Sequence, residues 1–152
     1  MEGFQMMKKI KKADRYVTFI PFNEETHLFI DDGIHFTSTN AKLLEYGADI
    51  KSYEGRTYYE YSADTPDKLK LFTNAYDLRY KALYQGEGFS AGVSSYPQII
   101  LFAGTFDYGA SATTTIKGFE IEAGNWVKKV DISEVTLIPI KIPIDLSQYL
   151  PS

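Results

Sequence analysis

The sequence predicts an α+β domain that is mainly β, a single β-sandwich or half-barrel of about eight strands with one helix packed on the sheet. Short segments rich in Val, Ile, Thr, Tyr and Phe recur along most of the chain and are separated by turn residues. One segment, residues 66–84, carries apolar side chains at a helical spacing instead. A length of 152 residues with 44% hydrophobic side chains suits one globular domain with a buried core.

Charge is uneven along the chain. Residues 1–15 hold five Lys or Arg and two acids, a net charge of +3. Because the whole chain has a net charge of −4, residues 16–152 have a net charge of −7. We expect a flexible basic arm at 1–15, a β-rich core domain at 16–135, and an edge strand with an extended arm at 136–152. The lysines of the basic arm are Lys8, Lys9, Lys11 and Lys12. Nucleic acid is expected as a partner only through this arm, because the body is acidic.

The first strands lie before residue 39. Residues 16–22 are β-branched and aromatic, and Pro21 places this strand at an edge or ends it. Residues 26–38 predict a hairpin with a three-residue loop at 31–33, in which Gly33 is left-handed. This register puts four apolar side chains on one face: Leu28, Ile30, Ile34 and Phe36. The same register sets Phe29 opposite His35, and His27 opposite Thr37.

A short helical turn and a second hairpin come next. Residues 39–47 predict one or two helical turns capped by Thr39 or Asn40 and ended by Gly47. Residues 49–62 predict a hairpin that turns at Glu54 and Gly55.

Residues 66–84 predict the one long helix. Thr65 suits the N-cap, Pro66 the first helical position and Asp67 the positive end of the helix dipole. Apolar residues recur at steps of three and four: Leu69, Phe72, Tyr76, Tyr80 and Leu83. Gly86 would then end the helix.

The remaining segments predict loops and strands. We expect a Gly/Ser-rich loop at 86–96, a strand at 98–103, and a flexible stretch at 104–112. An alternating strand at 113–122 follows, and a turn at 123–125 leads to a strand at 126–132.

The last strand, residues 135–146, contains Pro139 and Pro143. Backbone N–H groups of alternate residues point to the same edge, so both prolines remove donors from one edge and leave the other intact. This predicts an edge strand with an isoleucine face made by Ile138, Ile140, Ile142 and Ile144. The strand either closes its own sheet, or its outer part, residues 142–150, reaches over a neighbouring subunit. The predicted interface residues are Pro139, Ile142, Pro143, Ile144, Leu146 and Tyr149.

Few residues offer catalytic or metal chemistry. Cysteine is absent, and His27 and His35 alone are too few for a metal site. The glycine-rich segment 86–92 follows the predicted helix and lacks the Gly-Lys-Ser/Thr ending of a phosphate loop. Glu120 and Glu122 lie about 7 Å apart on one strand face by strand rise, a spacing that half-exposed strands commonly show. We expect no catalytic residue, no metal and no cofactor.

Aromatic residues make up 15% of the chain. The candidate ligand-binding or interface aromatics are Tyr53, Tyr58, Tyr61 and Trp126. Exposed tyrosines build protein interfaces, and on β-sandwiches they also stack sugars.

The sequence therefore favours a non-enzymatic structural protein that assembles with copies of itself or with other subunits. Its layout resembles that of phage and virus particle proteins, although no motif matches. A sugar-binding module and a small hydrolase or lyase with a carboxylate-based site are the alternatives. We expect a soluble protein with no export signal, because the longest apolar run, residues 99–103, is far below the roughly 20 residues that span a bilayer.

Overall fold

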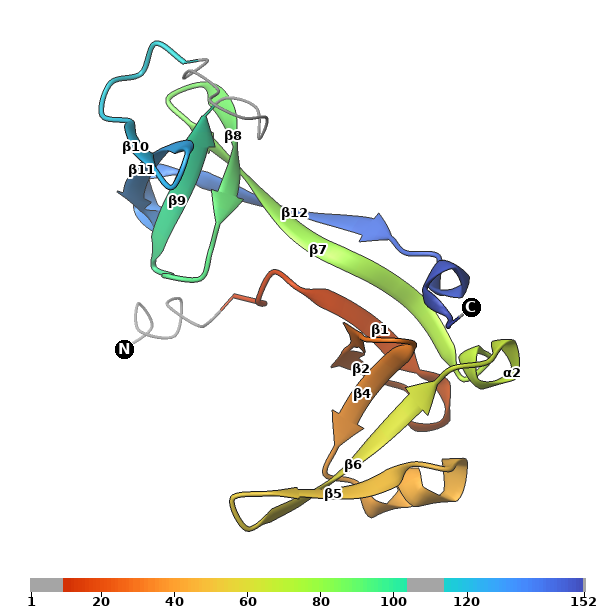
Figure 1. The fold of residues 1–152 in the computed structure, drawn as a ribbon. Helices are drawn as coiled ribbons and strands as arrows, with labels where there is room; N and C mark the ends of the chain where they lie inside the picture. Colours follow the sequence, from red (N-terminus) through yellow and green to blue (C-terminus); the bar gives the residue numbers. More distant parts are fainter. Residues whose placement is uncertain (1–9, 104–113, 152) are drawn as a thin grey trace. The chain divides into compact units, whose positions relative to one another are not determined.

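The computed structural model describes residues 10–103 and 114–151. The predicted fold class, α+β and mainly β, is confirmed, because antiparallel strands dominate and the helices are short (Figure 1). No helix in these two ranges is both long enough and apolar enough to cross a membrane.

Hydrogen bonds join the strands into two sheets. The larger sheet has the order β10-β11-β9-β8-β7-β1-β2, with β12 also paired to β7. Its strands are β1 (Arg15–Phe19), β2 (Glu24–His27), β7 (Phe72–Tyr84), β8 (Glu87–Gly92), β9 (Gln98–Ala103), β10 (Glu120–Glu122), β11 (Asn125–Asp131) and β12 (Thr136–Pro143). The smaller sheet has the order β3-β4-β6-β5, with strands β3 (Phe29–Ile30), β4 (Ile34–Ser38), β6 (Arg56–Ala63) and β5 (Asp49–Tyr53).

Short helical segments connect the strands. The α-helix α2 (Pro66–Leu69) precedes β7. The 3-10 helices are η1 (Ile20–Phe22), η2 (Ala41–Tyr46), η3 (Ile132–Glu134) and η4 (Leu146–Tyr149). As predicted, η2 is capped by the Asn40 side chain and ends at Gly47, whose φ is +92°. Pro21 ends β1 by starting η1.

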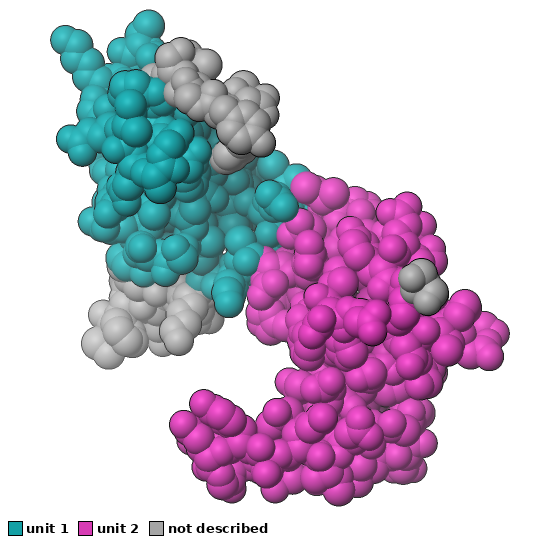
Figure 2. Space-filling view, viewed as in Figure 1, with its two compact units in different colours: residues 1–13, 78–141 teal, residues 14–77, 142–152 magenta. Residues whose placement is uncertain are grey.

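The chain divides into two compact units, coloured separately in Figure 2. One unit comprises residues 1–13 and 78–141, and the other comprises residues 14–77 and 142–152. Strands β7 and β12 each contribute residues to both units. The division into a basic arm, a core domain and a C-terminal arm stays a prediction.

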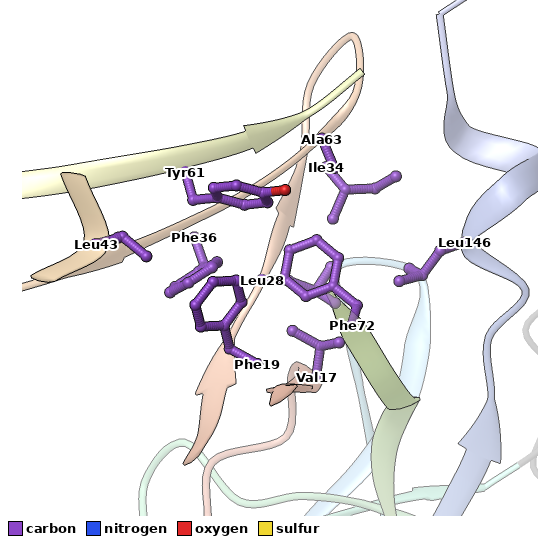
Figure 3. Packing of buried hydrophobic residues seen from close by; sticks show 10 residues of the cluster. All are labelled: Val17, Phe19, Leu28, Ile34, Phe36, Leu43, Tyr61, Ala63, Phe72 and Leu146. Carbon is purple, nitrogen blue, oxygen red and sulfur yellow. The ribbon is translucent and has the colours of Figure 1, made fainter. Parts of the chain in front are cut away.

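The 14–77/142–152 unit is built around an aromatic core (Figure 3). The core residues are Val17, Phe19, Leu28, Ile34, Phe36, Leu43, Tyr61, Ala63, Phe72 and Leu146. Phe19 contacts the rings of Phe36 and Tyr61 at centroid distances of 4.9 and 5.4 Å. Aromatic pairs at these separations add stabilisation beyond the area that they bury.

Both predicted hairpins of this unit form. Phe29 lies opposite His35, and the three-residue loop has Gly33 at φ +118°, as predicted. Tyr53 lies opposite Arg56 across a two-residue turn, also as predicted. The prediction for His27 was wrong, since His27 pairs with Tyr16 on β1 instead of Thr37. At Leu28, whose N–H donates to the Arg15 carbonyl, the chain passes from pairing with β1 to pairing with β4.

The predicted helix at 66–84 is wrong beyond its first turn. Only α2 is helical, and β7 continues as a strand of 13 residues. From Tyr76 to Tyr84, every second residue of β7 is buried, while Leu83, which the helical spacing places inside, is 42% exposed. Gly86 therefore closes no helix, and it instead forms the two-residue turn between β7 and β8 with Gln85.

The 1–13/78–141 unit contains two further corrections. The predicted loop at 86–96 includes strand β8, which pairs with both β7 and β9. The predicted strand at 113–122 is limited to β10, because only these three residues pair with β11. The strand at 98–103 is confirmed as β9, and its buried residues Ile99 and Leu101 belong to the core of this unit. The flexible stretch predicted at 104–112 lies outside the described residues.

Candidate functional site

The C-terminal strand is held by its own chain. Strand β12 pairs with β7, and the Ile144 N–H donates to the Ala75 carbonyl of β7 at 3.0 Å. Because alternate N–H groups point to the same edge, the ring nitrogens of Pro139 and Pro143 lie on the opposite, free edge. In the single chain this strand closes its own sheet, and the reading in which residues 142–150 reach over a neighbouring subunit stays a prediction.

The predicted interface residues of this segment divide into two groups. Leu146 is 9% exposed and packs in the core beside Phe72 (Figure 3), and Ile144 is partly buried against the same core. Both side chains thus pack on the core of their own chain, and their contact with a neighbouring subunit stays a prediction. The exposed members are Pro139, Ile142, Pro143 and Tyr149.

The candidate aromatics also separate. Tyr53 is 68% exposed, and it shares the outer face of the β5–β6 hairpin with the half-buried Tyr58. Tyr61 was wrongly predicted as a ligand aromatic, because its ring faces the core and its hydroxyl donates to the Lys68 carbonyl at 3.0 Å. Trp126 is half-buried on β11, opposite Ile121. The structure thus brings Tyr53 and Tyr58 to one surface, while Tyr61 lies on the opposite face of β6 and Trp126 belongs to the other unit.

The basic arm is described only in its last residues, so Lys8 and Lys9 lie outside the described part. Lys11 and Lys12 are exposed, but the backbone around them is anchored, because the Tyr80 hydroxyl donates to the Lys11 carbonyl at 2.6 Å. Burial, with a smaller contribution from Lys141, lowers the pKa of Lys11.

A polar cluster surrounds His35 on the outer face of the smaller sheet. The Nδ1 atom lies 2.7 Å from the Ser62 hydroxyl, and Nε2 lies 2.7 Å from the Asp31 carbonyl. A carbonyl only accepts, so Nε2 carries a proton and donates to the Asp31 carbonyl. The Ser62 hydroxyl donates to a Glu60 carboxylate oxygen at 3.4 Å. A Glu60 oxygen lies 3.5 Å from Nδ1, and the Phe29 ring stacks on the imidazole at 5.0 Å.

None of the residues of this cluster lines either of two hollows in the described part of the chain. One hollow, of about 500 Å³, is lined by Ile10, Lys12, Ala13, Gly92, Val93, Ser94 and Tyr96. The other, of about 240 Å³, is lined by Phe19, Phe22, Glu24, Glu25, Thr26, Phe36, Thr37, Ser38 and Thr39. Residues 10–103 and 114–151 contain no group of three or more His, Asp or Glu side chains that could hold a metal.

Sequence reasoning missed the most exposed aliphatic side chains on two edge strands. Ile50 of β5 is 62% exposed, and Ile121 of β10 is 65% exposed. Strand β5 ends the smaller sheet and β10 ends the larger one, and every residue of both strands is exposed. The aromatic residues around Ile50 drew the sequence interpretation to Tyr53 instead. No spacing rule marks a strand as the last one in its sheet.

These two edge strands carry the two most exposed isoleucines in the part of the chain that the structure describes. Comparison with protein-family models, with curated proteins and with solved structures finds no match to this chain.

Proposed function

We propose that this protein is a non-enzymatic structural subunit that assembles with copies of itself through open edges of its β-sheets, as subunits of a phage or virus particle do. The observation that carries this proposal is the exposed isoleucine on each of two unpaired edge strands, Ile50 on β5 and Ile121 on β10. An edge strand presents unsatisfied N–H and C=O groups that another strand can pair with.

The exposed isoleucines give such pairing a hydrophobic contribution. Full burial of an isoleucine stabilises by roughly 1.5–3 kcal/mol. Since Ile50 and Ile121 are about six-tenths exposed, a partner that covers each would gain about 1–2 kcal/mol per side chain. Burial together with backbone pairing favours association over an isolated chain.

Other edges carry features that oppose pairing. On the free edge of β12, Pro139 and Pro143 lack N–H donors. Strand β3 has only two residues, and β2 places Glu24 and Glu25 along its edge. Natural sheets use prolines, short strands and charges to prevent edge-to-edge aggregation. Protection of these edges supports β5, a strand of five residues without proline, as an edge used for assembly.

Sedimentation velocity of the full chain across a concentration series tests the proposal. We expect oligomers whose population rises with concentration and falls in the double variant Ile50→Thr/Ile121→Thr, which keeps β-branched residues in both strands. Leu83→Thr, an exposed position on the internally paired strand β7, is the matched control and should assemble like the wild type. A wild-type chain that stays monomeric at every concentration would refute the proposed function.

A sugar-binding module is the second candidate function, favoured by Tyr53 and Tyr58 on one exposed face. Aromatic side chains on a β-sheet face offer flat apolar area with a polar tip. Titration of the ¹⁵N-labelled chain with oligosaccharides would then shift amide signals of β5 and β6, and Tyr53→Ala would abolish these shifts. Absence of any shift at millimolar sugar would exclude this candidate.

A further inference from the structure

We infer that β5 pairs antiparallel with β5 of a second copy, about a two-fold axis at Ile50, and joins the two smaller sheets into one. This inference rests on the proposed self-assembly and identifies the surface through which two copies meet. It requires only residues of the 14–77/142–152 unit.

The side chains of β5 are arranged for such a contact. Ile50 lies opposite Tyr59 of β6, on the same face as the buried Tyr61, so Ile50 extends the core-facing side of the sheet to its edge. In a pair centred on Ile50, the two isoleucines lie directly opposite each other. Each therefore covers apolar surface that the single chain leaves exposed.

Charge complementarity fixes this register. Asp49 and Lys51 flank Ile50 and both point to the outer face of the hairpin. When Ile50 faces its own copy, Asp49 of each chain lies opposite Lys51 of the other. Two opposite-charge pairs form by symmetry. In a register shifted by one residue, Lys51 or Asp49 would face Ile50, and in one shifted by two residues, Lys51 would face Lys51 or Asp49 would face Asp49.

The single chain leaves both charges available. No ion pair within residues 10–103 and 114–151 involves Asp49 or Lys51. Asp49 lies opposite Glu60 on β6. Like charges opposite each other in a sheet are destabilising, so a lysine delivered by a second copy would relieve a repulsion that is present in the isolated chain.

Pairing of two identical edges gives a closed two-fold dimer, the commonest symmetry of soluble oligomers. The dimer uses no residue of β10, so larger assembly through that second edge is compatible with it.

A charge swap within one chain tests the pairing. Lys51→Glu places two acids against two acids across the two-fold axis and should weaken dimerisation about tenfold, as measured by sedimentation equilibrium on the full chain. The double variant Asp49→Lys/Lys51→Glu restores both opposite-charge pairs and should recover the wild-type dissociation constant. Lys70→Glu, the same charge change at the end of α2, is the control and should have no effect.

Each result has one meaning, provided that the circular dichroism spectra of the variants match the wild type. Weakening by Lys51→Glu with recovery in the double variant supports the β5 pair. Weakening without recovery indicates that Lys51 meets a different acidic surface, such as Glu120 and Glu122 of β10, and overturns the two-fold pairing. An oligomer that neither variant changes also overturns the pairing while the proposed assembly stands, whereas a monomeric wild type refutes the assembly itself.

Discussion

Truncation of one side chain decides whether the C-terminal segment is part of the core or a detachable arm. Leu146→Ala removes three carbon atoms from a side chain that is 9% exposed. At about 0.8 kcal/mol per buried carbon, the lost burial is about 2 kcal/mol, and the cavity left beside Phe72 adds to it. We therefore expect a loss of about 2–3 kcal/mol, a large fraction of the 5–15 kcal/mol that stabilises typical proteins.

Urea unfolding followed by circular dichroism measures this loss. With a slope of about 2 kcal/mol per molar urea, the midpoint should fall by about 1–1.5 M. Gln148→Ala, an exposed position in the same 3-10 turn η4, should change stability by less than about 0.5 kcal/mol. If Leu146→Ala unfolds at the same urea concentration as Gln148→Ala, Leu146 is not part of the core, and an exchangeable arm becomes the better description.

Two other predictions concern single positions of the same unit. Gly33 has φ +118°, and a Cβ added there would lie 3.1 Å from the Ala63 carbonyl oxygen, whereas Gly55 has φ +77° and open space around it. Thermal denaturation should therefore show that Gly33→Ala lowers stability by at least about 1 kcal/mol relative to Gly55→Ala. Equal stabilities of the two variants would refute this reasoning. Burial, with the charge of Asp64 adding to it, raises the pKa of Tyr61 above its ordinary 10.0, so the unfolded chain loses the phenolic proton first. This contribution to stability is complete below about pH 10 and is lost as pH rises through the folded-state pKa, and urea midpoints measured between about pH 9 and 11 should fall less steeply in Tyr61→Phe than in the wild type.

Strand β7 shows why local spacing misled the prediction of a helix. Tyr76 and Tyr80 are four residues apart, and a step of four satisfies both the helical period and twice the strand period. Leu78, Ala82 and Tyr84 decide between the two, because they continue the alternation and are all buried. Tyrosine also favours strands over helices. The alternation of apolar residues along this segment therefore indicated a strand. The capping residues before it, which belong to the single turn α2, led to the prediction of a helix instead.

Glycine after residue 84 reinforced the same error. Gly86 adopts φ +83°, and Gln85 before it has φ +48°. A left-handed glycine suits both the end of a helix and the second position of a tight hairpin turn. The Glu54–Gly55 turn was predicted correctly because the segments on both sides alternate without ambiguity. Turn residues thus mark where the chain reverses direction. The spacing of the apolar residues on either side indicates whether the turn connects two strands or ends a helix.

The candidate site was predicted least well, because a side chain's exposure depends on which strand lies next to it. Tyr61 and Tyr53 both belong to the β5–β6 hairpin, yet one is 2% and the other 68% exposed. Because side chains alternate between the two faces of a strand, the sequence correctly places Tyr58 on the opposite face of β6 from Tyr59 and Tyr61. This alternation does not show which face meets the core. That choice is made by Phe19 and Phe72, which pack on Tyr61 from distant parts of the sequence.

Proline position and strand order together explain which edges remain open. Prolines in the C-terminal strand show from the sequence alone that one of its edges donates few hydrogen bonds, and the Ile144–Ala75 bond places that edge away from β7. Strand β5 carries no such protection: it has no proline, its isoleucine continues the core-facing side, and its two charges alternate in sign around that isoleucine. Selection against pairing would be expected to place like charges or a proline there. An edge that is both apolar and charge-complementary to itself is therefore better explained as a contact surface than as an unprotected end of the sheet.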